Sequence, residues 1–525
     1  MQVWIEGTNQ GSLTNAEGRY QIVGVQAGQV TVRVQSIGFG TVGQTVNVLS
    51  GERVTVDFAL EEQVLAMDEI VVTGTAGQAR RREIGNTISQ ISSRELDAMP
   101  IRNLGDVLQG RIAGGVISDA SGQVGAGRAI RLRGVNSLTM ANIPLVYVDG
   151  GRINSDPFNA APGVNNAASP LNSLNPDDID RVEIIKGAAA STLYGTEASS
   201  GVIQIFTKRG SRGEPEWSLK VSQGVNNMGH VGPREDPTGL WFNDCTMFPG
   251  CPARGSWLRN GHVQKYNLSV QGGAAALSYF LSGRWAKEEG VLDLQHSTDW
   301  SLRGNFGFAA SPTLNIQFTS AYAHSGIRWL EEGNNAQGLV TSIIRGPAGL
   351  SPNVDHSYHF DRQVWTYLDQ LTSGVNVLWI PTTWMTHRVN AGLDLSGSES
   401  SRERPWGDPL LRGGDRSVNT EDRRRLSFDY AGTLTHSFGQ NVSSSSSWGA
   451  QLYERFNKGV DGYGRDFAGP GTKVIGSGAV TSSSEGHIRM VSGGVFLEQT
   501  LGWQDRLFVT GGVRWDGFST FGEGL

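Results

Sequence analysis

Apolar and polar residues alternate with a period of two over most of the chain after about residue 217. In one such stretch the apolar face carries Leu277, Tyr279, Leu281 and Trp285, and the polar face carries Ser278, Ser282 and Arg284. The same alternation recurs at 300–308, 314–322, 425–434, 490–501 and 506–515. Strands with one lipid-facing apolar side and one lumen-facing polar side are typical of transmembrane β-barrels. This part of the chain therefore predicts barrel strands.

The expected connections between these strands alternate in length. Tight turns are expected at 272–275, 311–313, 381–383, 439–441 and 503–505, and long loops at about 226–261, 325–363, 398–422 and 457–487. Short periplasmic turns and long outer loops are the barrel arrangement. The pattern predicts about eleven strands over 213–525, and single-chain bacterial barrels close with even numbers. We therefore expect an unfinished barrel, about its first half.

A compact mixed α+β domain is expected over 81–212. Short β-branched strands separated by Gly, Asn, Asp and Pro turns lie at 129–132, 145–148, 182–185 and 202–207, and one helix is expected over 103–110. Composition alone leaves a soluble binding domain as an equal alternative for this part of the chain.

The first 62 residues predict a small β-sandwich, because alternating stretches at 30–39, 44–49 and 53–60 read as strands. A linker follows at 63–80. The chain starts without a basic n-region or an apolar h-region, so we expect either an internal start or a cytosolic protein.

Composition narrows the function classes. The net charge of -6 and a pI near 5.9 give no basic surface for nucleic acid. No run of about 18 apolar residues predicts a transmembrane helix, so a membrane role requires a barrel. Glycine, at 71 of 525 residues, is far above its usual share of about 7%. The chain has no GxSxG, P-loop or HExxH motif, so we expect neither an enzyme nor a cofactor.

Cys245 and Cys251 lie close together in a loop rich in turn-forming residues. A thiolate metal site needs more ligands, and a redox CxxC has a different spacing. A small disulfide in an oxidising compartment is favoured over a free pair.

Three further groups have an ordinary and a functional interpretation. His356 and His359, beside Asp355 and Asp361, are either solvated loop residues or metal ligands, and we expect no metal site. Four aromatic residues in the expected outer loops either stack on sugars or pack within the loops: Trp241, Phe242, Trp257 and Trp329. Four arginines either meet lipopolysaccharide phosphates or are simply solvated: Arg402, Arg404, Arg412 and Arg416.

The segments VYVDG, DDIDRVEIIKG, ASTLYG and SSGVIQIFTKRG occur in that order between Val146 and Gly210. They closely resemble the plug domain of TonB-dependent outer-membrane transporters, in particular the SusC/RagA family. One departure is TEASSG at 196–201, where that family more often has a basic residue and Asn before the glycine. The resemblance implies a plug signature of Asp149, Gly150, Asp178, Glu183, Lys186, Gly187, Tyr194, Gly195 and Gly201.

Two further resemblances concern the segments before the plug. Residues 1–62 resemble the carboxypeptidase-regulatory-like domain of SusC-type transporters, with an earlier strand missing. The linker resembles a TonB box through Asp68, Glu69, Ile70, Val71, Val72, Thr73 and Gly74. A last sandwich strand or a plain linker remains the alternative. An extended segment can add a strand to a partner sheet through main-chain hydrogen bonds.

The resemblance implies active import of glycan or peptide oligomers across the outer membrane. The implied partners are TonB with the ExbB/ExbD energy system, a SusD-like lipoprotein, the oligosaccharide or peptide substrate and outer-membrane lipid. Two alternatives are a siderophore or cobalamin receptor without a lipoprotein partner and a soluble secreted β-rich adhesin or glycan-binding protein. The expected fold class is mainly β: a small sandwich, an α+β plug and part of a transmembrane antiparallel barrel.

Overall fold

The computed structural model describes the chain except for residues 1, 7, 9, 16, 17, 37, 38, 61–87, 93, 94, 97–103, 120, 136, 138–141, 160–166, 187–193, 230–244, 247–250, 275, 332–337, 340–357, 440, 472, 505 and 521–525. No helix within the described residues is both long enough and apolar enough to cross a membrane.

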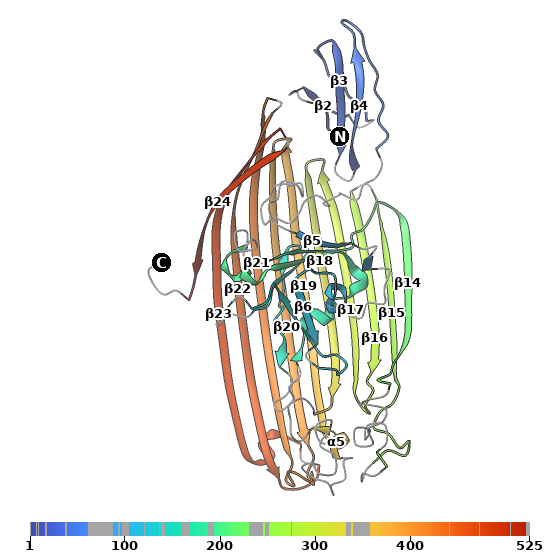
Figure 1. Ribbon diagram of the computed structural model, residues 1–525, viewed down its shortest axis with the longest axis vertical. Helices are drawn as coiled ribbons and strands as arrows, with labels where there is room; N and C mark the ends of the chain where they lie inside the picture. Colours follow the sequence, from blue (N-terminus) through green and yellow to red (C-terminus); the bar gives the residue numbers. More distant parts are fainter. Residues whose placement is uncertain are drawn as a thin grey trace.

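Eleven antiparallel strands form one continuous sheet in which each strand pairs with its neighbours in sequence (Figure 1). They are β14 (Gly213–Asn226), β15 (Gly261–Gly273), β16 (Leu277–Glu289), β17 (His296–Ser311), β18 (Leu314–Trp329), β19 (Gln363–Thr382), β20 (Met385–Arg404), β21 (Asp415–Phe438), β22 (Val442–Phe467), β23 (Gly478–Trp503) and β24 (Leu507–Phe518). This confirms the expected barrel-type sheet. Two short elements, α5 (Tyr358–Asp361) and η8 (Ile475–Ser477), lie in its connections.

The register of the strands places apolar and polar side chains on opposite faces of this sheet. Trp285 lies opposite Trp300, and Phe306 lies opposite Phe318, all on the exposed outer face. Arg303, next to this apolar row in the sequence, is buried on the inner face. Cross-strand aromatic pairs stabilise neighbouring strands, and the alternation follows directly from the pleat. The outer face is thus suited to lipid and the inner face to polar contacts.

The prediction of long loops is wrong for two of the four connections, those expected at 398–422 and 457–487. The connections there are only 405–414 and 468–477, because the flanking strands β20 to β23 run for 20, 24, 26 and 26 residues. A tilted strand needs about 9–11 residues to cross a membrane, so these strands extend beyond it. Their outer parts carry polar pairs, such as Asn419 Nδ2 donating to Asp461 Oδ1 at 2.6 Å, which makes the sequence look like loop. The connection 290–295 is short as well.

A compact domain, here called the plug, packs against the inner face of the sheet (Figure 1). Its elements are β5 (Ile88–Ser92), α2 (Leu104–Leu108), β6 (Gly115–Asp119), β7 (Arg128–Leu132), β8 (Leu145–Val148), β9 (Gly151–Arg152), β10 (Phe158–Asn159), β11 (Ala167–Ala168), η3 (Pro170–Ser173), η4 (Pro176–Asp178), β12 (Ile179–Ile185), η6 (Thr196–Ser200) and β13 (Val202–Thr207). The expected strands at 145–148 and 202–207 have these bounds in the structure.

The plug is built on a five-stranded mixed sheet with the order β5-β12-β13-β8-β9, in which β13 and β8 run parallel. Strands β12 and β13 are buried along most of their length. Their side chains, with α2 and the β6–β7 hairpin, form one hydrophobic core that includes Leu108, Ile130, Val182 and Ile203. A contiguous core of this size explains why the domain keeps its own shape against the larger sheet.

The first part of the chain forms one four-stranded antiparallel sheet with the order β2-β1-β3-β4. Its strands are β1 (Gln2–Ile5), β2 (Gly11–Leu13), β3 (Gly28–Ser36) and β4 (Phe39–Val48). The strand expected at 53–60 is wrong, because these residues pair with no strand. Phe58 and Leu60 instead pack against the core of the sheet around Val3 and Val34. The alternation of apolar and polar residues at 53–60 therefore belongs to a segment that packs on the sheet, not to a strand paired within it.

Within the described residues the eleven-stranded sheet is open, since β14 and β24 form its two edges. We expect residues 1–525, produced alone, to fail to form a sealed pore. Unpaired edge groups in hydrocarbon cost several kcal/mol each, so the protein should aggregate or be degraded. The check is heat-modifiable migration and protease resistance in outer membranes, with the full-length receptor as control. A heat-modifiable, protease-resistant monomer would contradict the expectation.

Candidate functional site

The plug meets the inner face of the sheet, here called the wall, at the turn between β8 and β9. Asp149 and Gly150 form the two-residue turn with φ of 48° and 84°, the positive values that tight hairpins require. The Asp149 carboxylate accepts hydrogen bonds from the backbone N–H of Thr207 at 3.0 Å and from its hydroxyl at 2.6 Å. The turn is therefore fixed to the end of β13.

This hairpin touches the wall through glycine. A Cβ added at Gly150 would lie 3.0 Å from Asn376 Oδ1, and one added at Gly392 of β20 would lie 2.7 Å from the Cα of Gly151. Backbones approach this closely only where side chains are absent. The position of the hairpin against β20 thus depends on three glycines.

Arg303 of β17 joins two signature carboxylates of the plug. Its Nε lies 3.3 Å from Asp178 Oδ2, and its Nη1 lies 3.9 Å from Asp149 Oδ2. The three side chains are 6%, 4% and 2% exposed. Breaking such a buried arrangement by removing one partner costs about 3–5 kcal/mol, because a charge remains buried without a counterpart. Arg303 is the residue of this site that the sequence analysis missed, as only its inward-facing position could be read from the alternation.

Asp178 is held from a second direction by Asn175. The Asn175 amide donates to Asp178 Oδ1 and to Asn267 Oδ1 of β15, both at 2.9 Å. Burial raises the pKa of Asp178, and Arg303 opposes that shift. A small cavity with room for a water molecule adjoins this group and is lined by Asn175, Asp178, Arg303 and Gln370, among others.

The remaining described signature residues lie within the plug or beside β22. Glu183 pairs with Arg181 at 2.9 Å, and Lys186 is buried at the end of β12. The rings of Tyr194 and Tyr147 are tilted by 50° with centroids 5.2 Å apart, in a cluster that includes Tyr453 of the wall. Gly195 and Gly201 flank η6 with φ of 80° and 97°. Gly187 lies outside the described residues.

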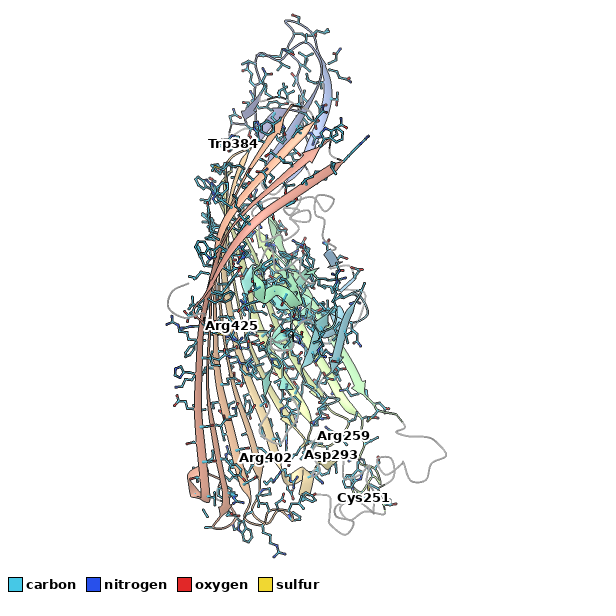
Figure 2. The ribbon with its side chains drawn as sticks, turned by 60° about the vertical axis from the view of Figure 1, so that its left-hand side comes forward. Cys251, Arg259, Asp293, Trp384, Arg402 and Arg425 are labelled. Carbon is cyan, nitrogen blue, oxygen red and sulfur yellow. A yellow bond between two sulfur atoms is a disulfide. The ribbon has the colours of Figure 1, made fainter. Side chains whose placement is uncertain are left out.

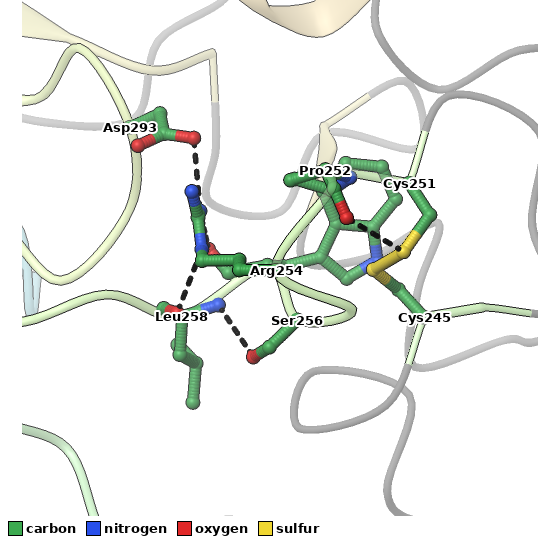
Figure 3. Close-up of a disulfide and its surroundings, with 8 residues drawn as sticks. Cys245, Cys251, Pro252, Arg254, Ser256, Leu258 and Asp293 are labelled. Atoms are coloured by element: carbon green, nitrogen blue, oxygen red, sulfur yellow. Dashed lines mark hydrogen bonds and ion pairs between the residues drawn. A yellow bond between two sulfur atoms is a disulfide. The ribbon is translucent and has the colours of Figure 1, made fainter.

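The outer loops form a second hydrophobic unit. A disulfide joins Cys245 and Cys251, whose Cα atoms are 5.4 Å apart, within bridging range. Cys245 packs with Trp257, Leu292, Leu330 and Leu339 from three connections. We call these five residues the outer-loop cluster. Arg254, three residues after the disulfide, donates to Asp293 Oδ2 at 2.8 Å and so ties the first loop to the second (Figure 3).

The plug contacts this cluster through Gln123. Its Oε1 accepts from the backbone N–H of Leu330 and from Gln295 Nε2, both at 2.9 Å. Its Nε2 donates to the carbonyl of Leu330 at 3.0 Å. One plug side chain thus binds both backbone groups of a residue in the outer-loop cluster.

The expected arginine loop is a buried ionic network at the outer ends of β20 and β21. Arg402 lies 2.8 Å from Asp415, and Arg404 lies 2.6 Å from Glu331. Arg362 bridges Glu331 and Asp408. Arg416 pairs with Glu403 at 3.0 Å, and Arg412 is exposed. The interpretation of Arg402 and Arg404 as ligands of lipopolysaccharide phosphates is wrong, because carboxylates already hold these guanidinium groups.

Several other candidates take the ordinary interpretation or lie outside the described residues. Trp257 and Trp329 are fully buried and present no face to sugars. The interpretation of His359 as a solvated loop residue is wrong, because its side chain is buried beside Tyr358, with ring centroids 4.0 Å apart. The described part of the chain contains no cluster of three metal-ligating side chains. Asp355, His356, Trp241, Phe242 and the whole TonB-box segment 68–74 lie outside the described residues.

Comparison with known proteins gives two family matches. Residues 80–202 match the TonB-dependent Receptor Plug Domain, and residues 1–72 match the CarboxypepD_reg-like domain. The chain is 33% identical over 424 residues to the TonB-dependent receptor SusC of Bacteroides thetaiotaomicron, covering 76% of this chain and 39% of that protein. It is 28% identical over 383 residues to the TonB-dependent receptor P26 of Formosa agariphila, covering 69% and 36%.

A solved structure of the RagAB peptide transporter has the same fold, with a TM-score of 0.68 and 17% sequence identity. The match covers 84% of this chain and 56% of that chain. The chain spans less than half the length of the two curated relatives.

Replacing Arg303 should loosen the plug. In Arg303→Met two carboxylates stay buried without their cation, so we expect the seated plug to lose about 3 kcal/mol of stability. Hydrogen exchange of β8, β9 and residues 175–179 in the full-length receptor should rise accordingly. Arg284→Met on the neighbouring strand β16 is the control, since among the described residues it is Arg303 and not Arg284 that pairs with Asp149 and Asp178. Equal hydrogen-exchange rates in Arg303→Met and Arg284→Met would show that the ion pairs of Arg303 do not hold the plug against the wall.

Removing the disulfide should loosen the first outer loop and spare the plug. The double variant Cys245→Ser/Cys251→Ser frees a loop with a sequence separation of 6, for which chain entropy gives about 2 kcal/mol. Limited proteolysis of the native receptor should then cut at 252–258 faster than in the parent protein. Identical cleavage rates would mean that packing around Trp257 alone orders the loop.

Proposed function

We propose that this chain, which is a SusC/RagA-type TonB-dependent receptor of the bacterial outer membrane, serves the active import of nutrient oligomers, either glycans or peptides. The cargo would enter from the outer-loop side and leave on the side of the first domain. Passage requires that the plug shift or rearrange, because it packs against the inner face of the sheet (Figure 2).

The observation that carries the proposal is the polar character of the contact between plug and wall. Asn305 Nδ2 donates to Thr207 Oγ1 at 2.8 Å and to the Lys208 carbonyl at 2.7 Å. These bonds add to the contacts of Arg303 with Asp149 and Asp178. The plug keeps its own apolar core, and its apolar contacts with the wall among the described residues are small clusters, at Ala168 with Trp329 and at Tyr194 with Tyr453. Separating the plug from the wall therefore also exposes polar groups that water can solvate. A permanent domain interface would be more apolar than this. The interface supports a domain that moves as a unit.

The force for this movement would come from TonB, energised by ExbB and ExbD, acting on residues 68–74. This segment precedes the plug and has the short β-branched composition that suits strand addition to a partner sheet. Pulling on it would act first on β5, which pairs with β12 beside the plug core. A SusD-like lipoprotein over the outer loops would complete the importer.

The exposed apolar rows on the outer face weigh against a soluble adhesin. Leu302, Phe308 and Phe318 are 58%, 46% and 44% exposed on adjacent strands. Contiguous apolar surface of this kind is rare on soluble monomers. The match of residues 1–72 to the CarboxypepD_reg-like domain favours the SusC type over a siderophore or cobalamin receptor.

A proline in the proposed TonB box should separate transport from binding. Val71→Pro removes a backbone donor and fixes φ, which disrupts strand addition, whereas Val71→Ile should be almost silent. We expect normal surface binding by the proline variant in the full-length receptor, with uptake reduced to that of a strain lacking TonB. Uptake of labelled cargo and binding at the cell surface measure the two steps.

Two outcomes would reject the assignment of the box. Wild-type uptake by Val71→Pro would show that the backbone of this segment is not used. Loss of surface binding together with uptake would show that the segment supports the fold of the receptor.

A further inference from the structure

The plug loop that ends at the start of β10, residues 154–158, lies against β20, β21 and β22. Arg423 holds this loop, because its Nη1 donates to the Asp156 carbonyl at 2.6 Å and its guanidinium lies 3.8 Å from the ring centroid of Phe158. Its remaining donors bind both oxygens of Glu421 at 2.6 and 2.9 Å. The charge of Arg423 is therefore compensated and its donors are occupied.

The next inward-facing arginine is placed differently. Arg425 of β21 lies directly opposite Arg455 of β22 in the strand register. Like charges in directly opposed positions destabilise a strand pair. Among the described residues, only one carboxylate lies within ion-pair distance of both: Asp156 Oδ2 is 3.6 Å from Arg425 and 3.5 Å from Arg455. Within the described part of the chain, two guanidinium groups share one plug carboxylate.

Other acidic groups near this pair are already engaged. Asp394 accepts from Gln370 Nε2 at 2.6 Å and from the backbone N–H of Asn154 at 3.3 Å, and it forms no ion pair among the described residues. Glu197 pairs with Arg152. Neither carboxylate lies within ion-pair distance of Arg455.

The donors of Arg455 are correspondingly underused. Its side chain is 42% exposed, and its Nε is buried with no hydrogen-bond partner in the described structure. Arg425, by contrast, is 6% exposed and donates to Asn457 Oδ1 at 2.7 Å and to Asn154 Oδ1 at 3.2 Å. Arg425 is thus a fixed charge, and Arg455 is the accessible member of the pair.

We infer that Arg425 and Arg455 form an anion subsite that binds a carboxylate of the transported oligomer, with Asp156 of the plug occupying it at rest. The inference rests on the proposed function and adds a substrate class to it: oligomers that carry carboxylates. A guanidinium fork matches a carboxylate in shape and charge, and a half-exposed arginine next to a fixed one offers donors from two directions. Movement of the plug would carry Asp156 away and leave the subsite to the cargo.

Calorimetric binding to the detergent-purified full-length receptor tests this subsite. The probes are tri-glutamate and tri-galacturonate, with tri-alanine and maltotriose as neutral counterparts. Arg455→Gln should weaken at least one acidic probe about tenfold, the loss of one charge-assisted contact, and leave the neutral probes unchanged. Arg455→Lys should retain part of the affinity. Arg489→Gln is the matched control, because Arg489 is 62% exposed and pairs with Glu454.

The plug carboxylate provides a second, opposite test. Asp156→Asn removes the resident competitor, so the acidic probe should bind several-fold more tightly than to the parent receptor. Because this change strengthens binding, misfolding cannot imitate it. Tighter binding of tri-glutamate alone identifies acidic peptides, and tighter binding of tri-galacturonate alone identifies acidic glycans.

The inference is overturned if Arg455→Gln and Arg489→Gln bind the acidic probes equally, or if the parent receptor binds neither of them. Failure of the proposed function gives a different result. In that case the acidic probe binds and responds to both substitutions, but whole cells show no TonB-dependent uptake of it.

Discussion

Every backbone amide and carbonyl of the lipid-facing sheet needs a partner, and hydrocarbon provides none. Long antiparallel pairing meets this requirement from β14 to β24, and the pleat then sends alternate side chains outward and inward. Apolar residues such as Leu302 occupy the outer face, so the intervening positions, including Arg303, form a polar inner wall. This alternation therefore determines which side chains a domain on the inner face of the sheet can contact.

A plug that docks on such a wall has to present polar groups and small residues. Asp149 and Asp178 meet Arg303, and the glycines at 150, 151 and 392 allow close backbone approach. A buried ion pair adds more to geometric specificity than to net stability, because desolvation offsets much of the attraction. Polar contacts and close backbone approach thus fix the register of the plug, beside apolar contacts at Ala168 and Tyr453.

Sequence reasoning found the elements whose local pattern and burial agree. Strands β8 and β13 have the expected bounds because each is a short apolar run between turn residues. Sequence reasoning failed where polar residues are held in strands by contacts with a neighbouring strand. The outer parts of β21 and β22 have the polar composition of loops, yet cross-strand pairs such as Asn419 with Asp461 keep them extended. The role of Arg303 was also out of reach, since its partners are more than 100 residues away in sequence.

Within the described residues, the plug side chain of Gln123 joins the plug to the outer loops, and this limits how they can move. Gln123 binds both the N–H and the carbonyl of Leu330, as a neighbouring strand would, and Leu330 belongs to the cluster that the Cys245–Cys251 disulfide orders. A shift of the plug at Gln123 must break both bonds to Leu330 or carry the outer-loop cluster with it. Because the disulfide and the packing of Trp257 stiffen that cluster, a small displacement on either side is transmitted as a rigid movement. Outer-loop position and plug position are therefore coupled through contacts that already exist in the resting state.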